Sequence, residues 1–366
     1  MELSKKFYIN NCKVMQELYK KNIPAKKLQE VQVGNEKKPI ICKFALRQSL
    51  EFTYFDKIVC DAVYTIWLFH QNNVSQKGKG FMILRPSEVL GFMSGARNIR
   101  ARKTASEESV TGSREARIIA TLEKLGNTEI AIDWKQDLEV RKLKKESPRI
   151  GGPMIPVKRI EGTNHFKLNL DWPLPLYYYA SKLNQIINIP MEYLTCGKWE
   201  NGEQTIPALK LANTDEVIML KHILLQRLEM IRNSKNNFRN VSIRYYYLSH
   251  KKAGVVEGIL PLMGILQNQY ASDSSWSNKK QDIHKKVCRI MDYYRAIGYV
   301  ESYEDAGMRE GKNRRSGIVG INITGKIGAD NEEAETVENG ETSSRQHKYK
   351  NVITDAKKEN TTKPKN

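Results

Sequence analysis

The sequence predicts an α+β protein made of two tandem domains of one kind, followed by a disordered C-terminal tail. One element order, helix, short strand, helix, helix and strand, occurs twice along the chain. In residues 279–323 an amphipathic basic helix leads into two strands joined by a basic loop. This order is typical of a winged helix, in which the last helix enters a DNA groove and the wing lies along phosphates. We therefore expect two tandem winged-helix domains.

Changes in composition predict the domain boundaries. Pro173 and Pro175 restrict the backbone and mark a joint between the two copies. Residues 328–366 lack periodic apolar side chains and are rich in Glu, Lys, Asn and Thr, which is typical of disorder. The expected parts are an N-terminal extension (1–48), a first winged-helix domain (49–172), a connecting helix and linker (173–212), a second winged-helix domain (213–327) and the tail (328–366).

The first domain is expected to open with a helix that Thr53 caps. Its apolar stripe repeats at helical spacing and comprises Phe55, Ile58, Val59, Ala62, Val63, Ile66 and Phe69. The elements expected next are a strand at 81–84, a helix at 87–93, a helix at 112–125, a strand at 128–134 and a returning strand at either 155–160 or 165–170.

A helix over residues 176–189 is expected to pack between the domains. The second domain should begin with a long helix that Thr214 caps, and 243–250 fits either a helix or a short strand. The basic helix over 279–297 should end at Gly298, since glycine is common just beyond a helix C-terminus. Strands over 299–303 and 317–323 complete the unit.

The charge of the chain favours a polyanionic partner. The 366 residues carry a formal net charge of +19, and the segment from Asp330 onward contributes −1, so residues 1–329 carry +20. This exceeds the magnitude of ~2–8 that solubility asks of a small domain, and such a charge attracts a polyanion at long range. Nucleic acid is favoured over an anionic membrane, because no basic amphipathic helix has a Trp, Phe or Leu face.

Targeting and redox signals indicate a cytoplasmic protein without a membrane partner. No apolar run approaches the ~20 residues of a membrane span, and the N-terminus does not resemble a signal peptide. The five cysteines form no C-x-x-C pair, so neither a disulfide framework nor a zinc site is expected.

The helix over 112–125 is the first predicted recognition helix. Its outward face should carry Arg117 and the small Ala120, which lets the helix approach DNA closely, and arginine binds guanine edges or phosphates. An ordinary solvated face is the alternative. The predicted DNA contacts are Ser113, Arg114, Arg117 and Lys124.

The helix over 279–297 is the second predicted recognition helix. Asn and Gln suit adenine, whereas Lys and Arg suit guanine or phosphate. The predicted contacts are Asn278, Gln281, Lys285 and Arg289 on the outward face and Lys279 and Lys280 beside it, with Lys286 as a further flanking cation. The wing tip adds Arg309, Lys312, Asn313, Arg314 and Arg315 as phosphate or minor-groove contacts. Residues 97–103 fit either a flexible arm on DNA or a disordered insertion.

Catalysis has no sequence signature in this chain. The six histidines form no His-x-His pair of the kind that a rolling-circle nickase needs for its metal. No G-x-x-x-x-G-K-[S/T] loop and no G-x-S-x-G motif is present. The tyrosine triplets at 177–179 and 245–247 are expected to pack in cores or interfaces rather than act as nucleophiles. We expect no enzyme, no catalytic residue, no metal and no cofactor.

The segment from Thr53 to Tyr64 and the helix–wing unit from Lys279 to Ile323 resemble the tandem winged-helix replication initiators of plasmids and mobile elements. The resemblance covers about residues 50–325, more in element order than in identity. It implies binding to repeated origin sites, local melting of AT-rich DNA, recruitment of host replication proteins, and homodimers at a repressed promoter. The long segment from Arg97 to Gly112 departs from the pattern and affects the register of the first recognition helix.

The sequence therefore predicts a protein that binds double-stranded DNA at specific sequences. Its predicted biological role is to initiate the replication of a plasmid or mobile element. A winged-helix transcriptional regulator would carry the same features. A basic adaptor or inhibitor of an acidic protein would show no site preference on DNA. A strand-transfer enzyme would form a covalent adduct through a tyrosine.

Overall fold

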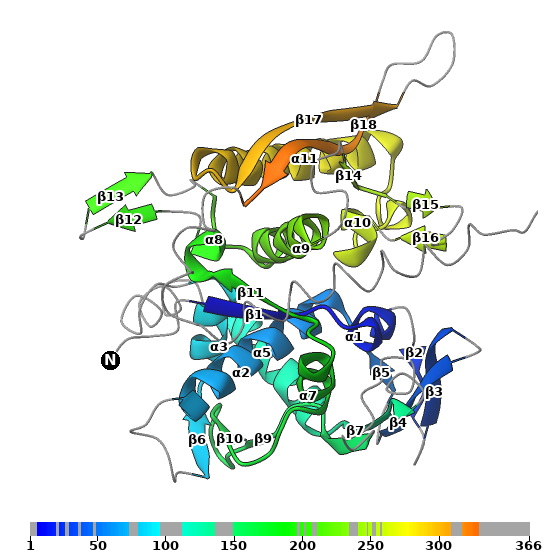
Figure 1. The fold of residues 1–366 in the computed structure, drawn as a ribbon, viewed down its shortest axis with the longest axis vertical. Helices are drawn as coiled ribbons and strands as arrows, with labels where there is room; N and C mark the ends of the chain where they lie inside the picture. The colour runs from blue at the N-terminus through cyan, green and yellow to red at the C-terminus, as the bar shows by residue number, and fades with distance from the viewer. Residues whose placement is uncertain are drawn as a thin grey trace, which may run out of the picture.

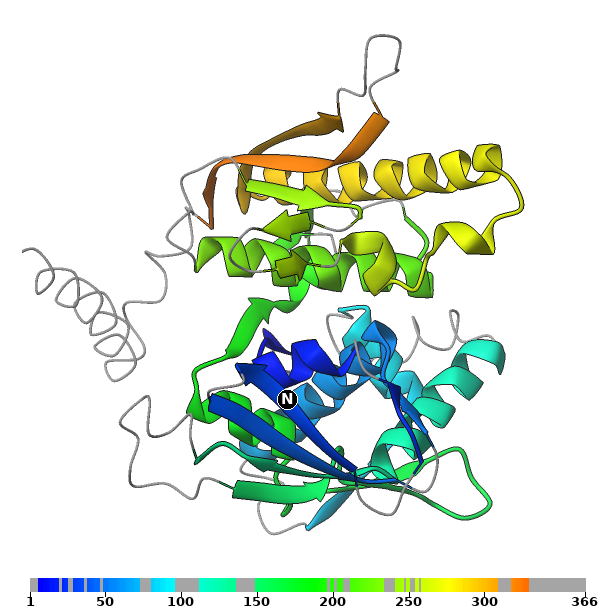
Figure 2. The same ribbon diagram turned by 90° about the vertical axis from the view of Figure 1, so that its right-hand side faces the viewer.

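The computed structural model has the predicted α+β class (Figures 1 and 2). It describes residues 6–19, 22–25, 29–35, 38–46, 49–72, 80–95, 112–135, 149–195, 198–200, 203–206, 211–233, 241–246, 248–250, 254–256, 258–308 and 317–328. The predicted arm at 97–103, the five wing-tip residues and the tail from 329 onward lie outside the described residues.

The first domain contains a helical core beside a small sheet. Its elements follow the order α2 (Tyr54–Asn72), β6 (Phe81–Leu84), α3 (Pro86–Met93), α5 (Gly112–Gly126), β9 (Val157–Arg159) and β10 (Phe166–Asn169). The sheet order is β6-β10-β9, so the last strand lies between the other two. Both candidates for the returning strand therefore form strands, and together they make the first wing.

The strand expected after α5 has a different role from the one predicted. It is present as β7 (Glu129–Asp133), but it belongs to a separate four-stranded sheet. The order of that sheet is β3 (Gln29–Asn35), β4 (Lys38–Ala45), β7 and β8 (Arg149–Pro153). Its alternating residues Ile130 and Ile132 are buried, and they lie opposite Phe44 and Cys42 of the N-terminal strand β4.

The N-terminal segment packs into the first domain. Strand β1 (Lys6–Asn10) pairs antiparallel with β11 (Ile186–Pro190), and α1 (Lys13–Leu18) follows it. Strand β2 (Asn22–Ile23) pairs with β5 (Leu50–Glu51) just before α2. Residues 1–48, which we expected to form an extension, thus contribute strands to three sheets.

Helix α2 is capped as predicted and is buried on all sides at its centre. The backbone N–H of Thr53 donates to Asp56, and the Asp56 N–H donates back to the Thr53 hydroxyl, which is a capping box. Lys57 and Asp61 form a buried ion pair of 2.5 Å one turn further on. Asp61 also accepts hydrogen bonds from the Asn10 N–H and the Tyr177 hydroxyl. This buried network joins β1, α2 and the helix α7 (Pro175–Lys182).

The helix predicted over 176–189 is wrong in its second half. Helix α7 (Pro175–Lys182) ends early, because Asn184 adopts a left-handed conformation with φ of 52°. The chain then forms β11, in which β-branched isoleucines pair with β1. The short elements after it are α8 (Met191–Thr195) and the hairpin of β12 (Lys198–Glu200) and β13 (Glu203–Ile206).

The second domain repeats the order of the first. Its main elements are α9 (Asp215–Arg232), β14 (Val241–Arg244), α10 (Ile259–Leu262), α11 (Asp273–Ala296), β17 (Val300–Met308) and β18 (Gly317–Ile327). The sheet order is β14-β18-β17, again with the last strand in the middle. A short hairpin of β15 (Leu248–His250) and β16 (Gly254–Val256), and a 3-10 turn at Gln267–Gln269, complete the domain.

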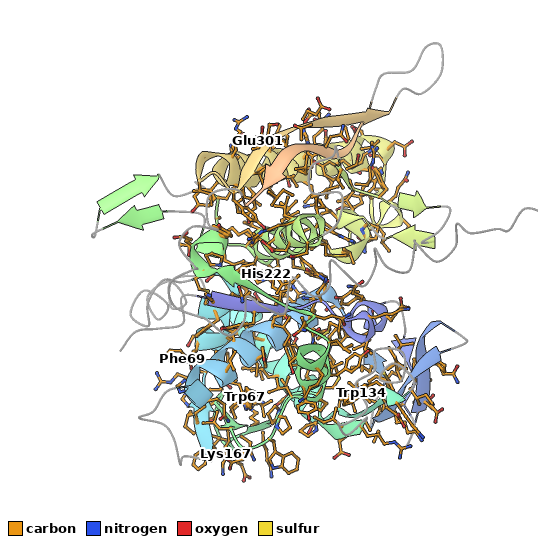
Figure 3. All side chains as sticks on the ribbon, viewed as in Figure 1. Trp67, Phe69, Trp134, Lys167, His222 and Glu301 are labelled. Carbon is orange, nitrogen blue, oxygen red and sulfur yellow. The ribbon has the colours of Figure 1, made fainter. Side chains whose placement is uncertain are left out.

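Helix α9 lies between the two domains (Figure 1) and contacts α2, α8, α11 and β18. Its buried His222 occupies the middle of the molecule (Figure 3) and makes a 2.8 Å hydrogen bond to the Met93 carbonyl at the end of α3. The Tyr54 hydroxyl of α2 donates to Gln226 of α9 at 2.7 Å. Helix α9 is thus the first helix of the second domain, and it also forms the interface with the first domain.

Candidate nucleic-acid interface

Helix α11 has the two faces that the sequence predicts. Ile283, Val287 and Ile290 are buried against the domain. The opposite face is exposed, and it comprises Asn278, Gln281, Lys285, Arg289 and Asp292. Within the described part of the chain, neither Lys285 nor Arg289 forms an ion pair. This face therefore presents amide and cationic groups to solvent, the kinds of group that bind base edges and phosphates, together with the carboxylate of Asp292.

The ends of α11 are set by local sequence. Ser272 and Ser275 form a reciprocal cap, so the helix starts at Asp273, six residues before the predicted start. Gly298 adopts φ of 74° directly after the helix, in agreement with its predicted role as a stop. The Tyr299 N–H then bonds to the Tyr294 carbonyl, and the chain turns into β17.

The cations that flank this face are partly engaged within the protein. Lys279 and Lys286 both form ion pairs with Glu216 in the first turn of α9. Burial alone would lower the pKa of Lys286, but its hydrogen bonds with Asp282 and Glu216 raise it. The Lys280 ammonium lies 5.5 Å from the centre of the Trp276 ring, a cation–π distance.

Helix α5 occupies the same place in the first domain as α11 does in the second. Ser113, Arg117 and Ala120 are exposed, as predicted. Arg114 and Arg117 both pair with Asp215 of α9, each through a 2.8 Å contact. The Arg117 guanidinium also lies 3.8 Å from the centre of the Phe55 ring. The two arginines predicted to contact DNA thus also contact the second domain, through Asp215.

Lys124 lies half-buried at the other end of α5. Its ammonium is 2.7 Å from the Asp56 carboxylate and 3.1 Å from the Glu51 carbonyl. These contacts join α5 to the capping box of α2. Lys124 therefore has a structural role. Helical periodicity had predicted only that its side chain points outward.

Two consecutive acids connect the predicted recognition helices. Asp215 pairs with α5 and Glu216 pairs with α11, and both acids lie in the first turn of α9 after its cap, Thr214. We call Asp215 and Glu216 the α9 acidic pair. It holds cations of both helices from one short segment, so the spacing of the two helices depends on α9.

The first wing contributes cations that the sequence did not indicate. Lys158 and Arg159 lie on β9 with exposed side chains. Arg159 forms a 2.8 Å ion pair with Glu123 of α5, and Asn164 in the wing turn bonds to Glu115 at 3.3 Å. The wing is therefore attached to α5. Its only sequence signal was the ambiguous strand pattern over 155–170.

The described tyrosines of the two triplets pack inside the protein as expected. Tyr177, Tyr179 and Tyr245 are buried. Burial raises the pKa of Tyr177, and its hydroxyl donates to Asp61 at 2.6 Å. A phenol with a raised pKa that is engaged in this way is a poor nucleophile.

Among the residues that the structure describes, no helix combines the length and apolar character needed to cross a membrane.

No model of a known protein family matches the chain, and no curated protein matches it. Solved structures that align with the chain over most of their own lengths include the two that follow. Domains 2 and 3 of RctB align with a TM-score of 0.38 at 10% identity, covering 86% of this chain and 98% of that one. The Pi initiator protein in complex with iteron DNA aligns with a TM-score of 0.35 at 11% identity, covering 88% of this chain and 99% of that one.

Proposed function

We propose that this protein binds double-stranded DNA at a specific sequence, with α5 and α11 as its two recognition helices, and that it is not an enzyme. The observation that carries the proposal is the exposed face of α11. Four side chains capable of reading bases or gripping phosphates, Asn278, Gln281, Lys285 and Arg289, share this face, while the opposite side of the helix is buried.

The relation between the domains supports the use of both helices. In the element order that the two domains share, each proposed recognition helix comes after two other helices, α2 and α3 or α9 and α10, and before two strands of a three-stranded sheet, β9 and β10 or β17 and β18. The α9 acidic pair contacts both helices, so they are held by one element rather than by a flexible linker. A net charge of +19 would supply the affinity that does not depend on sequence.

The first test is selection of duplexes from a random pool, followed by mobility shift and footprinting at two salt concentrations. We expect one recurring sequence, a footprint longer than one helix can cover, and affinity that falls steeply with salt. Salt-sensitive binding without any preferred sequence would contradict the proposal and favour the adaptor, whose partner would be an acidic protein.

We further propose that the DNA site is a replication origin of a plasmid or mobile element, with host replication proteins as partners and a homodimer as a second state. The resemblance in residues 50–325 supports this finer function. A plasmid that carries repeats of the selected site, and has no other origin, should be maintained only in cells that express the protein. Repression of a reporter without such maintenance would identify a transcriptional regulator instead.

A further inference from the structure

Three metal-binding side chains of the second domain lie together, beside the exposed face of α11. His284 and Cys288 are one turn apart on α11, and Asp305 is on β17. One ligand atom from each residue lies within 4.8 Å of the other two. The cluster therefore joins the recognition helix to the strand that leads to the second wing.

Two distances within this cluster match the spacing of ligands around a tetrahedral metal ion. The His284 Nε2 atom is 3.5 Å from the Cys288 sulfur and 3.4 Å from an Asp305 oxygen. Zinc binds nitrogen at ~2.0–2.1 Å, sulfur at ~2.3 Å and oxygen at ~2.0–2.2 Å. At tetrahedral angles these bond lengths place neighbouring ligands roughly 3.3–3.6 Å apart. The distances from His284 Nε2 to the Cys288 sulfur and to the Asp305 oxygen thus already match two ligand–ligand distances of such a site.

The environment of His284 suits a metal ligand. Its other ring nitrogen, Nδ1, lies 2.6 Å from the hydroxyl of the buried Tyr245. When Nδ1 carries the proton and donates to this oxygen, Nε2 keeps its lone pair for a metal ion. The Cys288 sulfur lies beside the ring, 3.5 Å from Nε2 and 3.8 Å from Nδ1. A hydrogen bond of this kind to the second ring nitrogen fixes the tautomer and orientation of histidines that bind metals.

We propose that His284, Cys288 and Asp305 bind one divalent transition-metal ion, with Zn²⁺ as the best match. A set of sulfur, nitrogen and oxygen ligands favours zinc over magnesium or calcium, which prefer oxygen alone. The thiol proton of Cys288 passes to solvent when the Cys288–metal bond forms. Three protein ligands leave a fourth position for water, and the Asp305 side chain is 51% exposed, so the ion can enter from solvent.

The bound ion would link α11 to β17. These two elements otherwise meet through contacts that include the Tyr303 hydroxyl, which donates to the Cys288 carbonyl at 3.1 Å and to Asp292 at 2.9 Å. A metal bridge would hold the second wing at a defined angle to the recognition helix. It would also stabilise the folded state, because a ligand that binds only the native protein shifts unfolding by mass action.

The test uses the full chain, purified without metal, and titrates it with Co²⁺ in the absence of DNA. We expect a one-to-one complex with a thiolate-to-cobalt charge-transfer band and the visible bands of a tetrahedral ion, both removed by added Zn²⁺. Cys288→Ser should lose the charge-transfer band. Asp305→Asn should weaken binding at least tenfold and keep its fold, since the side chain is half-exposed.

Two control variants remove similar groups outside the cluster. Glu304→Gln replaces an exposed carboxylate on the adjacent position of β17, and His165→Asn replaces a histidine of the first wing. Both should bind Co²⁺ as the unchanged protein does. A wild-type protein without a one-to-one complex would overturn the proposal, as would unchanged spectra in both Cys288→Ser and Asp305→Asn with circular dichroism showing them folded. Because no DNA is present, these outcomes do not depend on the proposed function.

Discussion

Asp215 and Arg114 form an ion pair across the interface of the two domains, with 2.8 Å between a carboxylate oxygen and the guanidinium Nε. The second oxygen of Asp215 pairs with Arg117. A single acid of α9 thus engages both arginines predicted to contact DNA from α5. This arrangement aligns the arginines, and it also places a negative charge beside a surface proposed to meet phosphates.

Removal of that charge should increase non-specific DNA binding. We expect Asp215→Asn to bind random-sequence duplex several-fold more tightly at low salt, because Arg114 and Arg117 gain freedom to contact phosphates. The slope of log affinity against log salt concentration should become steeper by about one to two, the change expected for one or two added phosphate contacts. Glu304→Gln is the matched control, since it changes net charge equally on an exposed site of the second domain. Equal affinities for the two variants would exclude a specific effect of Asp215.

The exposed face of α11 should carry sequence preference. Arg289→Ala and Lys285→Ala should each weaken binding to the selected site by roughly 1–3 kcal/mol if they contact bases. Arg295→Ala is the control on the same helix. The Arg295 side chain is exposed and pairs with Asp292, and such surface ion pairs contribute little to the stability of the fold. Competition mobility shifts measure the three variants side by side. If Arg289→Ala and Lys285→Ala behave as Arg295→Ala does, the recognition helix is misassigned.

Acidification should loosen the contact between the domains through His222. Burial lowers the pKa of His222 from 6.5 to about 3. Below pH 6.5 the unfolded chain takes up a proton that the folded protein excludes. The free energy of unfolding should therefore fall as pH drops from about 6.5 toward 3, by at most ~1.4 kcal/mol per pH unit from this group.

Comparison of the wild type with His222→Gln isolates that contribution. Glutamine can still donate to the Met93 carbonyl but does not titrate. Urea unfolding at several pH values between 7 and 5 should give a smaller loss of stability in His222→Gln than in the wild type. His165→Gln, at a half-buried position in the first wing, should follow the wild type. Parallel pH profiles for all three proteins would mean that His222 does not control this response.

The buried pair of Lys57 and Asp61 should matter for folding. Lys57→Met leaves a buried carboxylate without its cation, so we expect a loss of about 3–5 kcal/mol in the free energy of unfolding. Lys158→Met on β9 removes an exposed lysine and should change stability by less than about 0.5 kcal/mol. Urea denaturation of both variants tests this. A small effect of Lys57→Met would show that Tyr177 and the Asn10 N–H suffice to hold Asp61.

The sequence by itself determined the features that depend on neighbouring residues. Helix periodicity placed Ile283 and Val287 inside and Lys285 and Arg289 outside, because side-chain direction repeats every 3.6 residues. Caps and stops such as Thr53 and Gly298 were also predicted, since their hydrogen bonds and backbone angles are local. The α+β class and the order of the main helices follow from these local signals.

Only the tertiary structure decided which distant segments meet. Strand β7 pairs with the N-terminal β4 rather than with the first wing, and a strand pattern does not specify its partner. Asp215 reaches Arg114 from 101 residues away, and Asp305 joins His284 and Cys288 only because β17 packs against α11. Such contacts depend on how whole helices and strands pack in space, and the spacing of residues along the chain does not specify that packing.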